Sequence, residues 1–171
     1  MFLDRFFRPR VTLAMGQKLY VGVVAQARTP ALYEAYGVPD TVEGRFELYT
    51  AHVFLLLDRL RGQGGRASET SQALFDTYLA ALDDALREMG VGDLSVGKKM
   101  RKLGEAFYGR VKSYESAFAA LPQTDHLQAL LGRTVYAQGG AENVAKLADY
   151  VLRQRAVLAD QKLDTLLDGQ A

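Results

Sequence analysis

The sequence predicts an all-α fold, a compact bundle of six to seven helices with a long C-terminal helix. Three observations predict it. Apolar residues recur every three or four positions through most of the chain, no segment alternates apolar and polar residues over the length of a strand, and only four prolines interrupt 171 residues. With 49% apolar and 24% charged residues, a chain of this length is expected to form one soluble domain with its own core.

The chain is expected to begin with a short arm, residues 1–10, in front of the first helix. The arm is rich in phenylalanine and arginine, and it is interpreted either as a frayed end that packs on the domain or as a weak membrane-surface contact through Phe2, Phe6 and Phe7. A helix over about 13–27 follows. A short helix then starts at Thr29-Pro30, because proline suits the first helical position, and stops at Gly37.

A long amphipathic helix is predicted over 42–61. Its apolar residues are spaced by four and three positions, and Asp40 and Glu43 have the spacing of a capping box at its N-terminus. His52 lies beside the apolar stripe and is interpreted as a partly buried polar residue bonded to a neighbour. Glycines within 62–65 end this helix.

The stretch LREMGVGDLSVGKKM, residues 86–100, joins the next two helices. The fourth helix is expected to begin near Ser68 or Thr70, and Gly90 fits the left-handed residue that follows its C-terminus. Gly92 and Asp93 are expected to turn the chain, and Ser95 to cap the fifth helix, which ends at Leu121-Pro122. A phosphate site is disfavoured, because no strand precedes the glycines and Asp93 would repel an anion.

Residues 122–171 are predicted to complete the same domain as the core, residues 11–121. They contain a helix over about 124–136 and a long last helix over about 141–167, separated by Gly139-Gly140. The sequence shows no internal repeat of fixed period.

The fifth helix carries a local excess of positive charge outside its apolar stripe. Gly97 and Gly104 within it each cost about 1 kcal/mol relative to alanine, which suggests that another group packs closely there. Aromatic residues and arginine, which are enriched at protein interfaces, follow at 107–110. A solvated face, with the tyrosines in the core, is the simpler interpretation. The alternative is a partner-binding surface made of Lys98, Lys99, Lys102, Tyr108, Arg110 and Tyr114.

Composition and motifs disfavour several classes of function. The chain has no cysteine, which excludes disulfides and thiolate chemistry. Its net charge of +1, from 21 basic and 20 acidic residues, argues against a DNA-binding protein. His52 and His126 lack the spacing of metal ligands, His126 is expected at the surface, and no serine lies in a Gly-x-Ser-x-Gly motif. We therefore expect no enzyme activity, cofactor or metal.

Four runs of residues occur in an order that resembles a known family. They are LYVGVVAQARTPALYEAYGVPDT (19–41), EGRFELYTAHVFLLLDRL (43–60), LFDTYLAALDDALREMGVGDLSVGKKM (74–100) and GEAFYGRVKSYESAF (104–118). Together they span about 13–121 and resemble the ubiquinol–cytochrome c chaperone family. The segment from Pro122 onward matches less distinctly. The residues assigned to helix junctions and structure are Asp40, Glu43, Arg45, Glu47, Gly90, Gly92, Asp93 and Ser95.

The resemblance implies a non-enzymatic assembly chaperone that binds newly made cytochrome b and assists biogenesis of ubiquinol–cytochrome c reductase. It implies a compact bacterial form, located in the cytoplasm or peripherally on the inner membrane face, with the ribosome exit region or an anionic membrane surface as further contacts. Two alternatives stay open. One is an all-α lipid or isoprenoid-binding protein or enzyme, with Asp83 or Asp84 assisting a metal. The other is a scaffold that binds membranes through the N-terminal arm.

Overall fold

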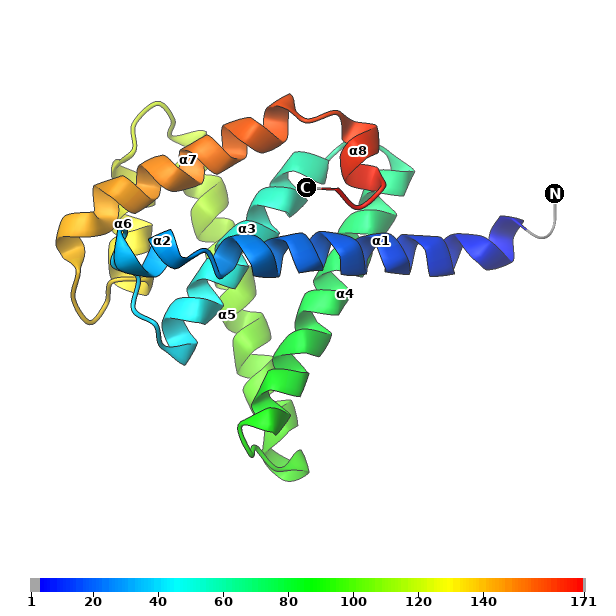
Figure 1. Cartoon of the computed structure of the whole chain (residues 1–171), viewed down its shortest axis with the longest axis horizontal. Coiled ribbons are helices and arrows are strands. Elements are labelled where there is room, and N and C mark those ends of the chain that lie inside the picture. The colour runs from blue at the N-terminus through cyan, green and yellow to red at the C-terminus, as the bar shows by residue number, and fades with distance from the viewer. Residues whose placement is uncertain (1–3, 171) are drawn as a thin grey trace.

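The computed structural model describes the backbone of residues 4–170 and the side chains of residues 12–170. Within this range the chain is all-α, as predicted, and contains no strand. Figure 1 shows the helices in order: α1 (Asp4–Ala27), α2 (Pro30–Glu34), α3 (Val42–Leu60), α4 (Gly65–Glu88), α5 (Asp93–Ala119), α6 (Asp125–Thr134), the 3-10 turn η1 (Ala141–Asn143), α7 (Val144–Asp160) and α8 (Leu163–Leu167).

The central helix is α3, which contacts α1, α4, α5 and α7. Its apolar residues divide between two core clusters, because a helix surrounded by neighbours buries side chains on more than one face. Phe54 packs with α5, α6 and α7, whereas Val53 and Leu60 pack with α1, α4 and α8. One helix thus joins both clusters of the core.

The N-terminus of α3 is capped by Thr41. Its hydroxyl oxygen accepts a hydrogen bond from the Gly44 amide at 3.1 Å, so the prediction of a capping box from Asp40 and Glu43 is wrong. The Asp40 carboxylate instead accepts a hydrogen bond from Arg45 Nε at 2.6 Å on the protein surface. Gly44 allows a close approach of the preceding loop, because a Cβ there would lie 2.0 Å from the Pro39 carbonyl oxygen.

The predicted helix boundaries need two larger corrections. The first helix begins at Asp4, so residues 4–10 of the predicted arm continue α1; Phe2 lies outside the described residues, as do the side chains of Phe6 and Phe7. The long last helix is broken into α7 and α8 at Gln161, whose backbone is extended. Arg59 stabilises this break by donating to the carbonyl oxygens of Leu158 at 2.8 Å and Gln161 at 3.0 Å.

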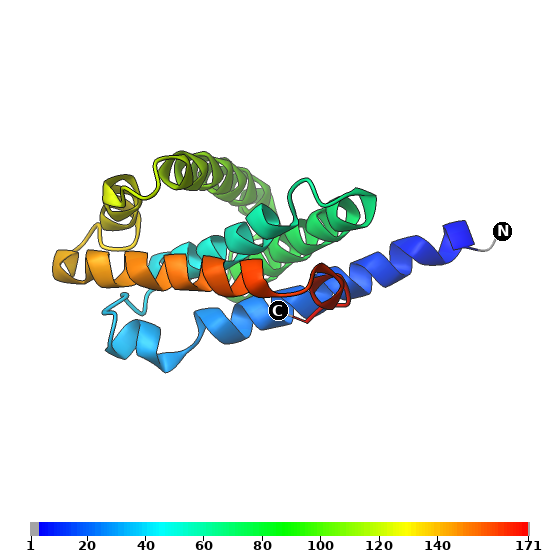
Figure 2. The same cartoon turned by 90° about the horizontal axis from the view of Figure 1, so that it is seen from above.

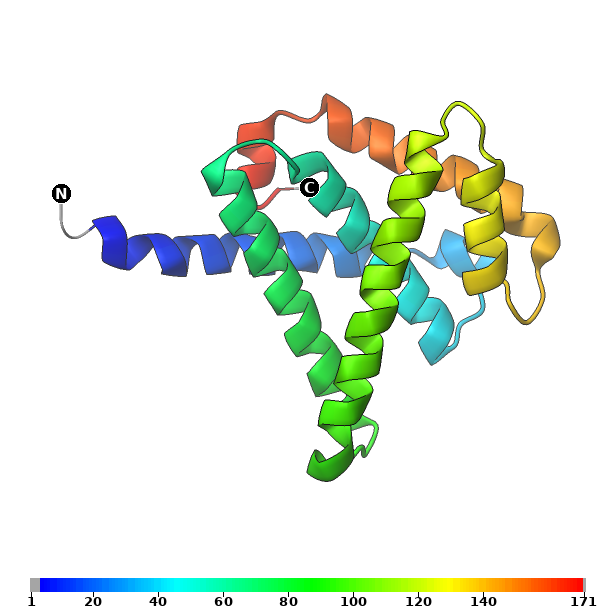
Figure 3. The same cartoon turned by 180° about the vertical axis from the view of Figure 1, so that it is seen from behind.

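The helices α4 and α5 form a hairpin that projects from the body of the molecule. In Figure 3 they approach one another at the tip and diverge toward α3, which gives the pair the outline of a narrow V. The long helix α1 crosses α4 near Gly16, where a Cβ would lie 2.5 Å from the Ala73 carbonyl carbon. The N-terminal part of α1 extends beyond the body on the other side (Figures 1 and 2).

Candidate functional site

The tip of the hairpin is a well-formed helix junction. Gly90 has a φ of +82°, and the amides of Gly90 and Val91 donate to the Arg87 and Leu86 carbonyls at 2.9 and 3.0 Å, the pattern that ends a helix with a left-handed glycine. The prediction for Gly90 is confirmed. Gly92, not Ser95, is the N-cap residue of α5, which begins at Asp93.

Arg87 ties the end of α4 to the start of α5. It donates to Asp83 at 2.5 Å and also to Asp93. These two hydrogen bonds connect the last turn of α4 to the first residue of α5, in a junction whose residues are mostly exposed. The structure does not support a metal site at Asp83 and Asp84. Asp83 is paired with Arg87, and the described residues contain no group of three or more side chains that could hold a metal ion.

Exposed lysines follow the tip along the outer side of α5. Lys98, Lys99 and Lys102 are all exposed, and Lys98 lies one turn before Lys102 on the same side of the helix. Gly97 and Gly104 have open space where a Cβ would stand, so nothing in the described chain packs closely against them, contrary to the interpretation made from the sequence. We call Lys98, Lys99 and Lys102 the lysine edge.

An aromatic groove of about 270 Å³ lies between α4 and α5, where the two helices diverge. Phe75 from α4 and Phe107 and Tyr108 from α5 form its wall, with ring centroids 5.0–5.9 Å apart. Leu57 of α3 and Val111 complete its apolar lining, and Ser68, Ser71 and Gln72 supply polar groups. We call this the α4–α5 groove.

Tyr108 is the predicted partner-binding residue that stands at this groove. Its side chain is 59% exposed, an unusual position for a large aromatic residue, although its ring still touches the groove wall. Tyr108 and the lysine edge are thus exposed on the same helix, but Tyr108 lies at the groove and about half a turn around α5 from Lys99. Sequence reasoning did not identify the groove itself, because its lining comes from three helices.

Arg110 and Tyr114 point in a different direction, toward α3. Arg110 makes a bidentate ion pair with Glu47, at 2.7 and 2.9 Å, and Glu47 is 5% exposed. Tyr114 is buried against Phe54, with stacked rings 4.9 Å apart, and burial raises the pKa of its hydroxyl. These two side chains attach α5 to the core, and we remove them from the partner-binding surface.

The two histidines occupy the positions that the sequence indicates. His52 is buried, and its Nδ1 donates to the Leu48 carbonyl oxygen at 2.8 Å, because that oxygen can only accept. Its Nε2 therefore accepts from the Tyr150 hydroxyl, also at 2.8 Å, and burial lowers the pKa of the imidazole. His126 is exposed at the start of α6.

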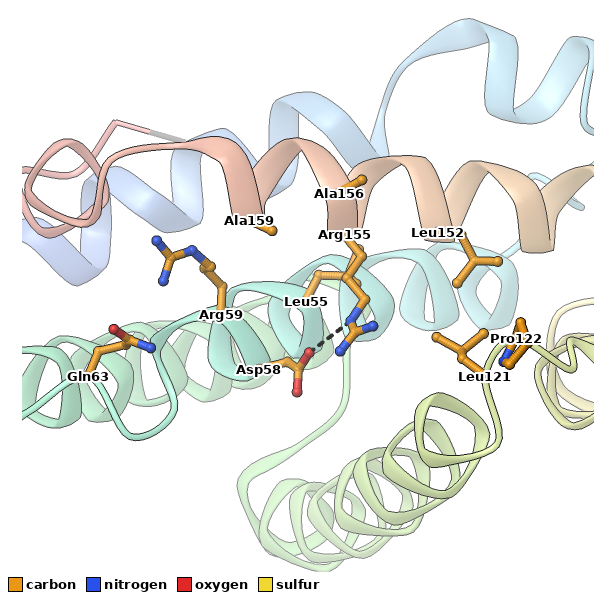
Figure 4. Close-up of a pocket in the computed structure, with 10 residues that line it drawn as sticks. All are labelled: Leu55, Asp58, Arg59, Gln63, Leu121, Pro122, Leu152, Arg155, Ala156 and Ala159. Atoms are coloured by element: carbon orange, nitrogen blue, oxygen red, sulfur yellow. Dashed lines mark hydrogen bonds and ion pairs between the residues drawn. The ribbon is translucent and has the colours of Figure 1, made fainter.

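A second, larger groove of about 780 Å³ lies on another side of the molecule, between the end of α3, the α5–α6 junction and α7. Figure 4 shows the Asp58–Arg155 pair in its middle, where the two side chains are 3.2 Å apart. The Arg155 guanidinium also lies over the Phe118 ring at 4.4 Å. Nothing in the sequence signals this groove, since its lining comes from three separate segments of the chain, within 55–63, 121–122 and 152–159.

Among the described residues, no helix has both the length and the apolar character needed to span a bilayer. The molecule combines a projecting helical hairpin, an aromatic groove and an exposed lysine edge. Fold and site together are typical of a helical protein that binds other macromolecules.

Comparison with known proteins gives a more specific result. The family model described as ubiquinol–cytochrome C chaperone matches residues 34–171. The crystal structure of the Cbp3 homolog from Brucella abortus is similar, with a TM-score of 0.85 and 34% sequence identity over 99% of this chain and 94% of that one. No curated protein matches. The chain therefore belongs to the ubiquinol–cytochrome c chaperone family.

This membership supports the role of an assembly chaperone, and nothing in the comparisons favours the lipid or isoprenoid alternative. The matched region also corrects the extent of the resemblance seen in the sequence. It includes α6, α7 and α8, whereas the characteristic runs of residues end near Leu121. The match therefore extends over the C-terminal helices, and Leu127, Leu130 and Leu147 from α6 and α7 lie in the core.

Proposed function

We propose that this protein is a non-enzymatic assembly chaperone that holds newly made cytochrome b, and that the client binds in the α4–α5 groove. The observation that carries the proposal is the partly exposed aromatic wall of that groove. Tyr108 is 59% exposed beside Phe75 and Phe107, so an apolar client segment would gain burial there without first displacing part of the fold.

The groove has the shape and chemistry that such a client needs. Its floor and walls are apolar, while Ser68, Ser71 and Gln72 along α4 offer hydrogen bonds to backbone groups of a bound segment. The groove lies where α4 and α5 diverge toward α3, a divergence that the ribbons of Figure 3 show. A helical client segment is the favoured occupant, because its backbone groups are already hydrogen-bonded to one another.

We further propose that the lysine edge and the hairpin tip contact an anionic surface near which the client is made. Leu94 is completely exposed at the tip and Met89 is half exposed, close to the lysine edge. An aliphatic side chain flanked by lysines suits the headgroup region of an anionic membrane, and this favours peripheral membrane contact over the ribosome exit region.

The client site is tested by co-purification of cytochrome b from cells that make both proteins. Tyr108→Ala should lower the recovered cytochrome b about fivefold or more, because a truncated aromatic anchor typically costs 1–2 kcal/mol of binding. Val21→Ala, a truncation of another exposed apolar side chain on α1, is the matched control. Equal recovery with both variants would refute the α4–α5 groove as client site.

The anionic contact is tested by flotation with vesicles of neutral or anionic lipid. Charge reversal of the lysine edge should abolish binding to anionic vesicles, whereas Lys162→Glu, at another exposed lysine, should not. Loss of ribosome association with unchanged flotation would assign the lysine edge to the ribosome instead. Magnesium-dependent turnover of a prenyl diphosphate by the purified chain would overturn the non-enzymatic assignment.

A further inference from the structure

The groove of about 780 Å³ shown in Figure 4 has an apolar floor and a wall that contains two alanines. Leu55 of α3, which is 2% exposed, lies in the floor, and Leu121 lies at one end. The α7 wall consists of Leu152, Ala156 and Ala159, spaced by four and three positions and therefore on one side of the helix. Both alanines are exposed, and side chains this small let another helix approach α7 closely. We call this the α3–α7 groove.

Every charged side chain in the lining of the α3–α7 groove is already paired within the protein. Asp58 and Arg155 form an ion pair at 3.2 Å, and the Arg155 guanidinium lies over the Phe118 ring. Arg59 donates to two carbonyl oxygens at the C-terminal end of α7, where the helix dipole favours a positive charge. A charged partner would find no free opposite charge in the groove, so the cost of removing it from water would not be offset.

Arg155 also keeps hydrogen-bond donors for a bound molecule. Its Nε donates to Asp58, whereas its two terminal nitrogens donate to no acceptor in the described part of the chain. The side chain is 42% exposed, so water reaches these donors in the free protein. A partner that covers them has to supply an acceptor, because a buried donor without one costs free energy. A hydroxyl or an amide oxygen supplies it without adding a charge.

From these features we propose that the α3–α7 groove binds a second segment of the client, an uncharged and mainly apolar helix with a hydroxyl or amide group facing Arg155. The inference rests on the proposed function, since it takes the client to be a newly made membrane protein. Helices that cross membranes combine apolar residues with serine, threonine or asparagine. From Leu152 to Ala159 the α7 wall runs about 10 Å, the length of about two turns of such a helix.

The two grooves lie at different sides of α5. Phe107 and Tyr108 of α5 line the α4–α5 groove together with α4, whereas Leu121, just after α5, lines the α3–α7 groove together with α7. Figure 3 shows α5 with α4 on one side and α6 on the other. A client with two apolar helices therefore has a separate site for each. Because the two segments belong to one chain, binding of the first raises the effective concentration of the second.

Photo-crosslinking in cells that synthesise cytochrome b tests the second site. One chain carries the photo-reactive residue at Ala156, in the α3–α7 groove, and a parallel chain carries it at Gln72, in the α4–α5 groove. Mass spectrometry of the digested products locates the crosslinked residues of cytochrome b. The Ala156 product should map to an uncharged apolar stretch, and this stretch should differ from the one reached from Gln72.

A steric variant tests whether the groove itself is occupied. Ala159→Phe places a ring in the groove at an exposed position, so it should lower the crosslink yield at Ala156 about fivefold or more. The yield at Gln72 and the melting temperature should not change. Ala145→Phe, the same substitution at an exposed position of α7 outside the groove, is the matched control and should keep the yield at Ala156.

A charge variant tests the neutrality of the site. Arg155→Glu places a second negative charge beside Asp58 and should lower the yield at Ala156 about fivefold or more, because an uncharged helix would then cover two unpaired carboxylates. Arg153→Glu makes the same change two positions earlier on α7, where the side chain bonds to the Tyr36 hydroxyl instead, and should keep the yield.

A cytochrome b product from Gln72 but none from Ala156 would overturn this inference and leave the proposed function standing. The absence of a product from both positions would overturn the two together. An Ala156 product that maps to a charged loop, or whose yield is the same in Ala159→Phe and Ala145→Phe, would also overturn the inference.

Discussion

Removal of the Arg110 guanidinium is expected to destabilise the fold, not to remove a partner contact. In Arg110→Met the side chain keeps most of its length, but the buried Glu47 carboxylate loses a bidentate partner. The Glu47 side chain is 6% exposed and that of Arg110 28% exposed, so water cannot replace the lost bonds at the carboxylate. Breaking a buried pair by removing one partner costs about 3–5 kcal/mol.

The lower end of that range applies here, because Arg110 is partly exposed. We expect Arg110→Met to lower the free energy of unfolding by about 3 kcal/mol at pH 7. With a urea dependence of about 2 kcal/mol per molar, the midpoint of urea unfolding, followed by helical circular dichroism at 222 nm, should fall by about 1.5 M.

The double variant Glu47→Gln/Arg110→Met removes the uncompensated charge together with its partner. It should recover most of the lost stability, to within about 1 kcal/mol of the unmodified chain, because a buried pair is often replaceable when both charges are removed. The structural interpretation would be refuted if Arg110→Met lowered the free energy of unfolding by less than about 1 kcal/mol and yet reduced the recovery of the client. Arg110 would then be assigned to the partner-binding surface.

Three further predictions concern the fold. Gly16→Ala should lower the melting temperature and cost about 1–3 kcal/mol, because the new Cβ would meet the backbone of Ala73 at the crossing of α1 and α4. Thr41→Ala should lower the free energy of unfolding, measured with a chemical denaturant, by about 1 kcal/mol, and Ser95→Ala by less than about 0.5 kcal/mol. Of these two residues, Thr41 caps a helix and Ser95 does not, so equal losses would contradict this assignment. His52 takes up a proton less readily when folded than when unfolded, so stability should fall by about 1 kcal/mol as the pH drops from 7.5 to 5.5, and His52→Gln should reduce this dependence.

The sequence was a good guide to local structure. The spacing of apolar residues located α3 and α5, and the glycine chemistry at Gly90 identified the hairpin turn. The exposure of the lysine edge followed from its position outside the apolar stripe of α5. These properties depend on residues close together in the chain, and periodicity and capping report on such residues directly.

Features that depend on distant partners were not predictable. Arg110 and Tyr114 have the composition of an interface, but Glu47, 63 positions before Arg110, draws the guanidinium into the core. The break between α7 and α8 contains neither glycine nor proline. Its unpaired carbonyl oxygens, those of Leu158 and Gln161, instead accept hydrogen bonds from Arg59, about 100 residues earlier in the chain. The α4–α5 groove likewise required the relative placement of three helices.

The most direct test of the client site is site-specific photo-crosslinking in cells that synthesise cytochrome b. A photo-reactive residue in place of Gln72, exposed on the α4 wall of the groove, should crosslink to newly made cytochrome b, and Tyr108→Ala in the same chain should reduce the yield. The same photo-reactive residue at Ala145, exposed on α7, should give no such product. Crosslinking of cytochrome b from Ala145 but not from Gln72 would contradict the assignment of the client to the α4–α5 groove.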